Sequence, residues 1–220
     1  MVEAVILYGS RARSDGENNS DTDLLGISTE GKIRKPFDSR GISFHVYPLS
    51  WLLEQSGQGS LFLLHVTSEA VPVFDPRNLL EDIRNEFEFK LTYKNEIEIG
   101  SRIVVAVLNL TEAEFSDKMR ARYFWGLRTV IMATAAEKRQ PLFASKALEN
   151  FCGIKGVASH IITRRDATLI DCQNIGRQVL HFLGDIPRGI LSVDAADNLR
   201  LLKEWGGIAA ATAGDIIYGL

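Results

Sequence analysis

The sequence contains little cysteine and no strong excess of charge of either sign. Only two of its 220 residues are cysteines, Cys152 and Cys172, and they are too few and too far apart for a zinc-ribbon pattern. We therefore expect free, buried thiols in a reducing cytoplasm. The formal net charge is −3, so the chain as a whole lacks the basic character of a nucleic-acid-binding protein, although a local basic groove is compatible with it.

Segments that direct a protein to or through a membrane are also missing. The N-terminus has no basic stretch followed by an apolar one, so we expect no secretory signal. The apolar stretch 208–220 is too short to span a bilayer and contains Asp215. Hydrophobic residues make up 45% and charged residues 24% of the chain, which is ordinary for a soluble globular protein of one large or two small domains. The sequence thus predicts a cytoplasmic protein without a membrane partner.

The most informative stretch is 5–27. Its first apolar run is typical of a buried strand and stops at Gly9 and Ser10. After a polar segment come Asp21 and Asp23, which lead into a second apolar run. Because side chains at i and i+2 of a strand share a face, the two aspartates point the same way. Their spacing suits one or two hard divalent cations, which prefer oxygen ligands.

The residues between the two strands favour phosphate binding. Gly9 would let a phosphate approach the backbone closely, and Ser10 would supply N–H and hydroxyl donors. Arg11 and Arg13 would add positive charge, although an arginine just past a turn is more often simply solvated. A Gly-Ser turn alone is usually only a turn, and an Asp-x-Asp pair alone is often a solvated cap. Their joint occurrence in this order favours a triphosphate cradle that faces a Mg²⁺ site.

This combination resembles the DNA polymerase beta-like nucleotidyltransferase superfamily, and most closely its minimal and aminoglycoside-type bacterial members. The superfamily signature is an apolar strand, Gly-Ser, roughly ten residues, and Asp-x-Asp on the next strand. In this sequence the signature is carried by Gly9-Ser10-Arg11-Ala12-Arg13 and by Ser20-Asp21-Thr22-Asp23-Leu24.

The resemblance implies an enzyme that moves a nucleoside monophosphate from an NTP, expected to be ATP, to an acceptor hydroxyl. Asp21 and Asp23 would be catalytic and hold Mg²⁺ or Mn²⁺. The nucleotide-binding set that the resemblance implies is Gly9, Ser10, Arg11, Arg13 and Ser20. The acceptor stays open between a small molecule, a protein side chain, a nucleic-acid end and another nucleotide.

The third strand departs from the family pattern. Residues 42–48 alternate cleanly between apolar and polar, and the position where the family has a third carboxylate is His45. A neutral imidazole would serve as a general base near pH 7, but it is a poor Mg²⁺ ligand and suits Mn²⁺ better. Two alternatives stay open. His45 is a strand histidine satisfied by a hydrogen bond, or the chain is a catalytically impaired nucleotide-binding or partner-binding protein, such as an antitoxin or a defence-system subunit.

The pattern of apolar residues predicts an α+β fold with two domains. A small mixed sheet with a nucleotidyltransferase arrangement is expected in 1–90, and an all-α domain in 91–220. Strands are predicted at 2–8, 22–29 and 42–48, with a further short strand within 32–37 and an edge strand at 71–76. Helices are predicted from Trp51 with Ser50 as N-cap, from Ser60 through His65, at 77–89, 117–138, 143–151, 155–164 and 167–183, and from Asp194 or Asp197 onward.

The first strand begins almost at the N-terminus, whereas relatives usually have a helix before it. This difference would leave one face of the sheet bare. We expect that face to be covered by the C-terminal part, by a second copy in a homodimer or by a protein partner.

The helical half offers one charged residue for the site. On the 117–138 helix, Arg120 lies within the apolar stripe, and a buried arginine needs an anionic partner. We predict that Arg120 reaches the cleft and meets phosphate or one of the aspartates. The alternative is an internal salt bridge to a structural glutamate. His65 and His160 lie in helical patterns without a second ligand at metal spacing, and we expect surface or core residues there.

Overall fold

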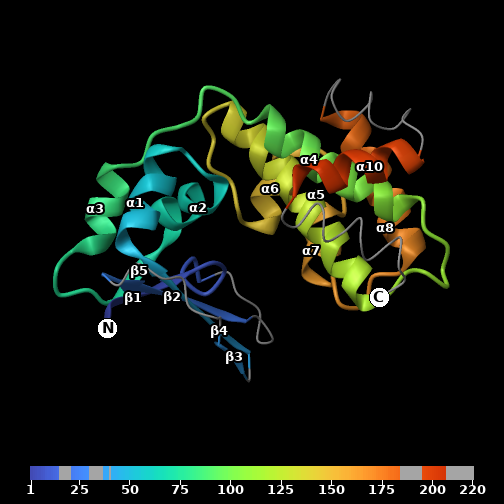
Figure 1. Ribbon diagram of the computed structural model, residues 1–220. Helices are drawn as coiled ribbons and strands as arrows, with labels where there is room; N and C mark the ends of the chain where they lie inside the picture. The colour runs from blue at the N-terminus through green and yellow to red at the C-terminus, as the bar shows by residue number, and fades with distance from the viewer. Residues whose placement is uncertain (15–20, 30–36, 40, 184–194, 207–220) are drawn as a thin grey trace. The chain divides into compact units, whose positions relative to one another are not determined.

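The chain folds into two compact units, Met1–Leu91 and Thr92–Leu220. The computed structural model describes residues 1–14, 21–29, 37–39, 41–183 and 195–206. The first unit contains a mixed sheet with helices, and the second is built from helices alone over its described residues (Figure 1). The architecture is therefore α+β, as predicted. Within the described residues no helix is long and apolar enough to cross a membrane.

The sheet of the first unit has five strands in the order β3-β4-β2-β1-β5. Strands β2 and β4 are parallel, whereas β1 pairs antiparallel with both β2 and β5, and β3 pairs antiparallel with β4. The short strand β5 forms one edge of the sheet, as the sequence predicts. The strands span Val2–Tyr8 (β1), Thr22–Ser28 (β2), Phe37–Ser39 (β3), Ile42–Pro48 (β4) and Val71–Phe74 (β5).

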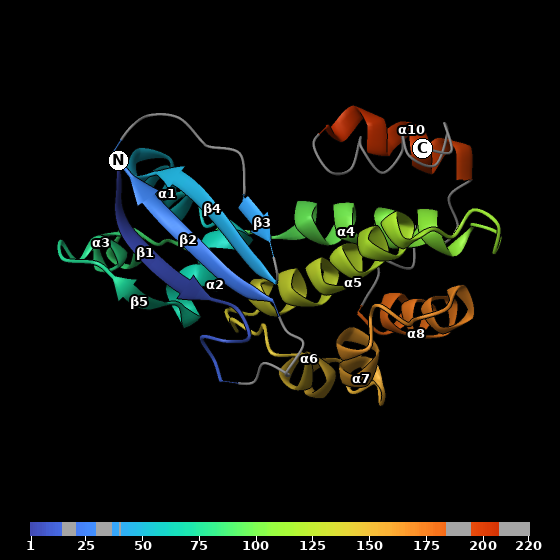
Figure 2. The ribbon, with the colours of Figure 1, turned by 90° about the horizontal axis from the view of Figure 1, so that it is seen from below.

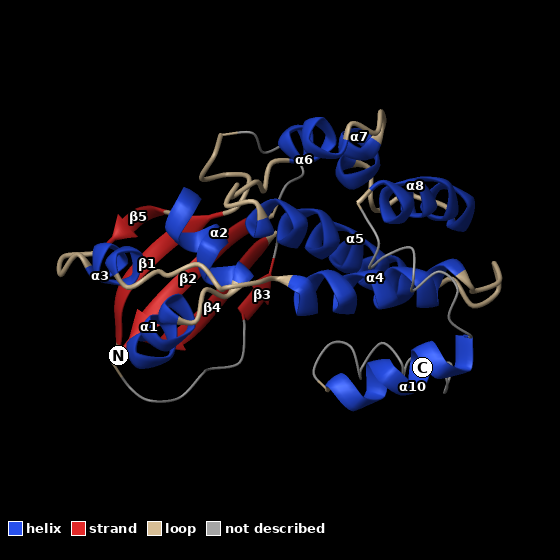
Figure 3. Ribbon diagram, turned by 90° about the horizontal axis from the view of Figure 1, so that it is seen from above, coloured by secondary structure: helices blue, strands red, loops and turns tan. Residues whose placement is uncertain are grey.

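The described helices of this unit lie on one face of the sheet (Figures 2 and 3). They are α1 (Leu49–Gly57), α2 (Leu61–Glu69) and α3 (Leu79–Asn85). Ile6 and Leu25 are paired across β1 and β2 and fully buried, in a core to which the helices contribute Leu52, Leu63 and Ile83. Side chains alternate between the two faces of a strand, so the residues two positions before and after Ile6 and Leu25 also face the helices.

The second unit is organised around two long helices, α4 (Lys94–Leu108) and α5 (Asp117–Glu137). They approach closely where Gly100 and Gly126 meet: a Cβ added at either glycine would lie 2.9 Å from the carbonyl oxygen of the other. Val104 and Leu127 are fully buried in the core beside this contact. The remaining described helices are α6 (Ser145–Cys152), α7 (Val157–Ile162), α8 (Leu169–Phe182) and α10 (Ala195–Trp205).

Several predicted helix starts are wrong: those at 77, 143, 155 and 167 each lie two residues before the observed starts, and the start at Trp51 lies two residues after the observed one. Helix α1 begins at Leu49 with Pro48 as N-cap, so Ser50 lies inside the helix. Helix α3 begins at Leu79, not at 77, because the Asp75 carboxylate accepts hydrogen bonds from the Leu79 N–H and from the Leu80 N–H, both at 2.9 Å. Asp75 lies three residues before the N-cap, Asn78, and its bonds to Leu79 and Leu80 hold the intervening loop against the start of the helix. The predicted strand within 32–37 falls largely outside the described residues.

The contact between α4 and α5 predicts the effect of adding one methyl group. Gly126→Ala should lower the free energy of unfolding by about 1–3 kcal/mol, because the new Cβ meets backbone rather than a side chain that can move aside. The measurement is the urea midpoint followed by far-ultraviolet circular dichroism. The matched control is Gly57→Ala in α1, where the nearest atom is the mobile carboxylate end of Glu86 at 3.3 Å. Equal midpoints for the two variants would contradict the backbone contact.

Candidate functional site

The two halves of the sequence motif meet where β1 ends and β2 begins. Tyr8 lies opposite Asp23 in the antiparallel register, so the turn that follows β1 starts beside the Asp-x-Asp pair. Gly9 adopts φ +77°, and a Cβ added there would lie 2.8 Å from Asp23 Oδ2. The Asp23 carboxylate therefore packs directly against the Gly9 backbone, at a spacing that only glycine allows.

The turn itself is closed by backbone hydrogen bonds. The N–H groups of Ala12 and Arg13 both donate to the Gly9 carbonyl oxygen, at 3.1 and 3.2 Å. Ser10 is half-buried at the start of this turn, and Arg11 is exposed. The described structure thus places a small-residue turn and an acidic side chain next to each other.

Asp21 lies at the start of β2, beside the loop that leads into β4. The Thr22 N–H donates to the Gly41 carbonyl oxygen at 2.7 Å, and a Cβ added at Gly41 would lie 3.8 Å from Asp21 Oδ1. Asp21 and Asp23 are both half-buried and, being two residues apart, lie on the same side of the strand. The loop before β4 and the turn after β1 therefore flank the two carboxylates.

His45 does not complete a metal site with the two aspartates. Among the described residues, no three histidine, cysteine, aspartate or glutamate side chains gather where they would hold a metal ion. His45 Nε2 lies 2.9 Å from Ser43 Oγ, and the imidazole ring stacks on Tyr47 with centroids 6.3 Å apart. In the parallel register Asp23 lies opposite Ser43, and His45 lies opposite Leu25. The catalytic role of His45 stays a prediction.

Tyr8 is a site residue that the sequence reasoning missed. Its ring packs edge-on against Phe62 and His65, at centroid distances of 6.0 and 5.8 Å. Burial first, and then the nearby charge of Asp23, raise the pKa of the Tyr8 phenol far above its usual value. Tyr8 is therefore a neutral hydroxyl beside the acids at every physiological pH. Its position two residues after Ile6 on the helix-covered face was the available signal.

Arg13 is anchored to α2. Its guanidinium Nη1 lies 2.5 Å from Glu69 Oε2 and 3.4 Å from His65 Nε2, and the same Glu69 oxygen lies 2.8 Å from the imidazole. The turn after β1 is thus tied to the C-terminal end of the helix that covers it. The i, i+4 spacing of His65 and Glu69 was visible in the sequence, but the third member, Arg13, is more than fifty residues away along the chain.

Two further predicted site residues, Ser20 and Arg120, are not among the described residues of the first unit. Ser20 falls outside the described residues. Arg120 belongs to the helical unit, where its Nη1 donates to Asp117 Oδ1 and to the Arg165 carbonyl oxygen, both at 2.8 Å. The guanidinium also lies 5.5 Å from the centroid of the Phe115 ring. Arg120 therefore forms an internal ion pair, as in the alternative interpretation of the sequence, but its partner is an aspartate and not a glutamate.

Comparisons with known proteins find a likeness among solved structures. No model of a known protein family matches the chain, and no curated protein matches it. Among solved structures, the chain is similar to a nucleotidyltransferase-like protein from Exiguobacterium sibiricum, with a TM-score of 0.31 and 14% sequence identity. The likeness covers 84% of this chain and 72% of that chain. A likeness at this level identifies no activity.

The packing of Asp23 on Gly9 can be tested with two glycines of the same backbone conformation. Gly9 and Gly41 have φ +77° and +75°, so an alanine costs about the same backbone strain, roughly 1 kcal/mol, at each. Only at Gly9 does the new Cβ collide with a carboxylate. Gly9→Ala should therefore destabilise the protein by about 1 kcal/mol more than Gly41→Ala in urea unfolding. Equal losses would show that Asp23 does not pack on the turn.

The contacts of Arg120 predict where its loss is felt. Arg120→Met should lower thermal stability slightly, by about 0.5–1 kcal/mol, because it removes an ion pair with an exposed aspartate. Affinity for ATP, measured by calorimetry, should stay within about twofold, because the donors named above serve the helical unit. Lys118→Met, on the exposed side of the same helix, is the control. A tenfold loss of ATP affinity in Arg120→Met alone would instead support a phosphate contact.

Proposed function

We propose that the sheet unit binds a nucleoside triphosphate with a divalent metal ion and transfers its nucleoside monophosphate to an acceptor hydroxyl. The observation that carries this proposal is the contact between Asp23 and Gly9. It places Asp23, the proposed metal ligand, at the start of one strand and the turn at the end of the adjacent strand. A phosphate could approach the backbone of this turn closely. The proposed nucleotide is ATP.

The donor set suits Mg²⁺. In nucleotide sites this ion is usually held by one or two carboxylates together with substrate phosphates, so Asp21 and Asp23 are sufficient protein ligands. When bound, the metal ion would neutralise charge on the phosphates and orient the triphosphate. The Gly9 and Ser10 backbone and the Ser10 hydroxyl would hold the terminal phosphates. Tyr8, a neutral hydroxyl beside Asp23, would donate to an oxygen of Asp23 or of the substrate.

The basic residues of the turn would contribute unequally. Arg11 is exposed beside Ser10 and would add positive charge at the triphosphate. Arg13 shares the Glu69 carboxylate with His65, so part of its charge is already neutralised. We propose that Arg13 mainly fixes the turn and that Arg11 is the stronger phosphate ligand. Ser20, in the polar segment before Asp21, completes the proposed nucleotide-binding set.

A second function is favoured by one specific observation. The described strand β4 supplies no third carboxylate, and His45 is within hydrogen-bond distance of Ser43. A protein that binds nucleotide without turnover would not need a third carboxylate. An antitoxin or a defence-system subunit would be a protein of this kind. We also propose that a second copy of the chain or a protein partner covers the sheet face away from the helices.

Transfer of label from NTPs separates these functions. Purified protein is incubated with α-³²P-labelled ATP, GTP, CTP or UTP, with Mg²⁺ or Mn²⁺ and with cell extract, and the labelled acceptor is identified by mass spectrometry. Asp21→Asn combined with Asp23→Asn should reduce transfer by about 100-fold or more, because the metal would lose both protein ligands. The control is Asp82→Asn, an exposed aspartate on α3.

Each outcome assigns a function. Transfer that requires the two aspartates supports the enzyme. Saturable ATP binding that requires them, without transfer with either metal, supports the second function. Absence of both binding and transfer, with all four nucleotides and both metals, would refute the nucleotide site itself.

A further inference from the structure

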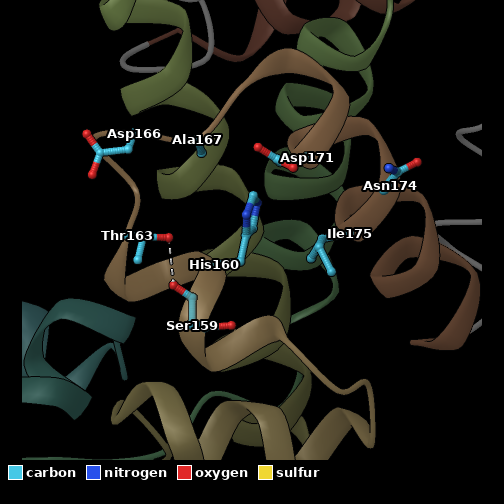
Figure 4. Close-up of a pocket in the computed structure, with 8 residues that line it drawn as sticks. All are labelled: Ser159, His160, Thr163, Asp166, Ala167, Asp171, Asn174 and Ile175. Carbon is cyan, nitrogen blue, oxygen red and sulfur yellow. Dashed lines mark hydrogen bonds between the residues drawn. The ribbon is translucent and has the colours of Figure 1, made fainter.

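The helical unit has a hollow of its own, between α7 and the start of α8 (Figure 4). Its volume is about 420 Å³, which is enough for a small organic molecule. Every residue that lines it lies between 159 and 175, within the second unit. The hollow is therefore a separate feature from the candidate nucleotide site and depends on none of its residues.

The centre of the hollow is a buried histidine. His160 is only 7% exposed, and in Figure 4 its ring lies below Asp171 and to the left of Ile175. Its Nε2 lies 3.1 Å from the hydroxyl of Tyr123, which is fully buried and has no other hydrogen-bond partner among the described residues. A buried hydroxyl needs an acceptor, so Tyr123 donates and Nε2 accepts.

This hydrogen bond fixes the tautomer of His160. Burial lowers the pKa of the imidazole, against a smaller opposing effect of Asp171, so the ring is neutral near pH 7. With Nε2 as acceptor, the single ring proton lies on Nδ1. Nδ1 has no hydrogen-bond partner within the described residues. The hollow therefore contains one N–H donor whose partner is missing.

The charged groups at the hollow are carboxylates. Asp171 Oδ2 accepts from the Thr168 N–H at 3.0 Å and from the Thr168 hydroxyl at 2.7 Å, and these bonds lower the pKa of the carboxyl. The other oxygen, Oδ1, accepts no hydrogen bond from the described residues. Asp166 adds a second, exposed carboxylate at the rim, and no lysine or arginine is among the described lining residues. The positive end of α8 is offset by the Asp171 charge.

The hydroxyl groups of the lining also present acceptors. The Ser159 hydroxyl donates to the Gly156 carbonyl at 2.9 Å, and the Thr163 hydroxyl donates to the Ser159 carbonyl at 3.0 Å. Their protons are thus committed to the α7 backbone, and their oxygens retain only lone pairs for a ligand. Ile175 gives the hollow an apolar side. The ligand that matches this set has a cationic donor, a short apolar portion and an acceptor oxygen.

We propose that this hollow is a binding site for a small amino alcohol. Its protonated amine would pair with Asp171 Oδ1, with Asp166 adding to the negative potential, and its oxygen would accept from His160 Nδ1. Asp171 is exposed, and neither of these two atoms has a hydrogen-bond partner within the described residues, so both can be reached by a ligand in the hollow. The proposal is independent of nucleotide transfer, and each can fail without the other.

The test uses the full chain labelled with ¹⁵N and the probe 4-amino-1-butanol at fixed ionic strength. Imidazole ¹⁵N–¹H spectra report the four histidines, and His160→Gln identifies the His160 signals. We expect Nδ1 of His160 to be the protonated nitrogen and its signal to shift saturably with the probe. The neutral 1,4-butanediol and the anionic 4-hydroxybutyrate should bind about tenfold more weakly or not at all, because they lack the cation.

Two variants complete the test. Asp171→Asn keeps an oxygen for the Thr168 cap but removes the charge, and it should weaken the probe about tenfold. Asp166→Asn, at an exposed position, should weaken binding of the probe by a smaller factor. It replaces Asp171→Asn in the test if that variant fails to fold. The control is Asp197→Asn, an exposed aspartate in the first turn of α10. No saturable shift of His160, an equal shift with the diol, or unchanged affinity in the folded charge variants would overturn the proposal.

Discussion

The candidate site depends on one close contact, the Asp23 carboxylate against the backbone of Gly9. The contact is possible because β1 and β2 are antiparallel and Tyr8 lies opposite Asp23, so the end of one strand and the start of the other coincide. A side chain at position 9 would occupy the space of the carboxylate, at 2.8 Å, and would also have to adopt φ +77°. Both constraints point to glycine. The consequence is a tight turn of small residues next to a negative charge, which is stable only if the charge is hydrogen-bonded, hydrated or paired with a cation.

The surroundings of this contact show how the fold holds a polar turn on an apolar core. Helix α2 packs Leu63 against the strand residues Ile6 and Leu25, and its C-terminal end carries the Glu69 that binds Arg13. The same helix contributes His65, which packs on Tyr8. A single helix therefore contributes to the core beneath the sheet and, with other residues, anchors the turn. This coupling means that hydrophobic packing, and not the turn sequence alone, sets where the small residues stand. A turn held in place in advance loses less conformational entropy when it binds a ligand.

The sequence predicts the elements that follow from a regular pattern, and fails where one particular side-chain contact decides the outcome. Alternation of apolar residues places β1 at Val2–Tyr8 and β4 at Ile42–Pro48 with their correct ends, and helical periodicity finds α5 within one residue. The start of α3 is missed because the hydrogen bonds of Asp75 compete with the proline signal. The apolar stripe around Arg120 shows that its guanidinium needs an anionic partner, but only the structure shows that Asp117, one turn earlier, is such a partner. His160 and Tyr123 are 37 residues apart, so no sequence spacing predicts their contact. The N–H donor of the hollow, His160 Nδ1, can be assigned only from this hydrogen bond, because the bond fixes the tautomer.

The third strand sets a limit on how much charge this site offers a metal ion. Asp23 lies opposite Ser43 in the parallel register, and the next residue on the same face of β4 is His45, whose Nε2 is close to the Ser43 hydroxyl. A neutral hydroxyl and imidazole add proton-accepting capacity but no negative charge. In the proposed function, Asp21 and Asp23 alone would supply the protein's negative charge to the cation, where the family that the motif resembles has three carboxylates. A site with less charge relies more on the ligand's own phosphates, so metal and nucleotide binding here should be strongly coupled. Such coupling is equally useful to an enzyme and to a nucleotide sensor. In the proposed function, His45 would therefore bear on the chemistry after binding, and the binding itself would depend on Asp21, Asp23 and the turn.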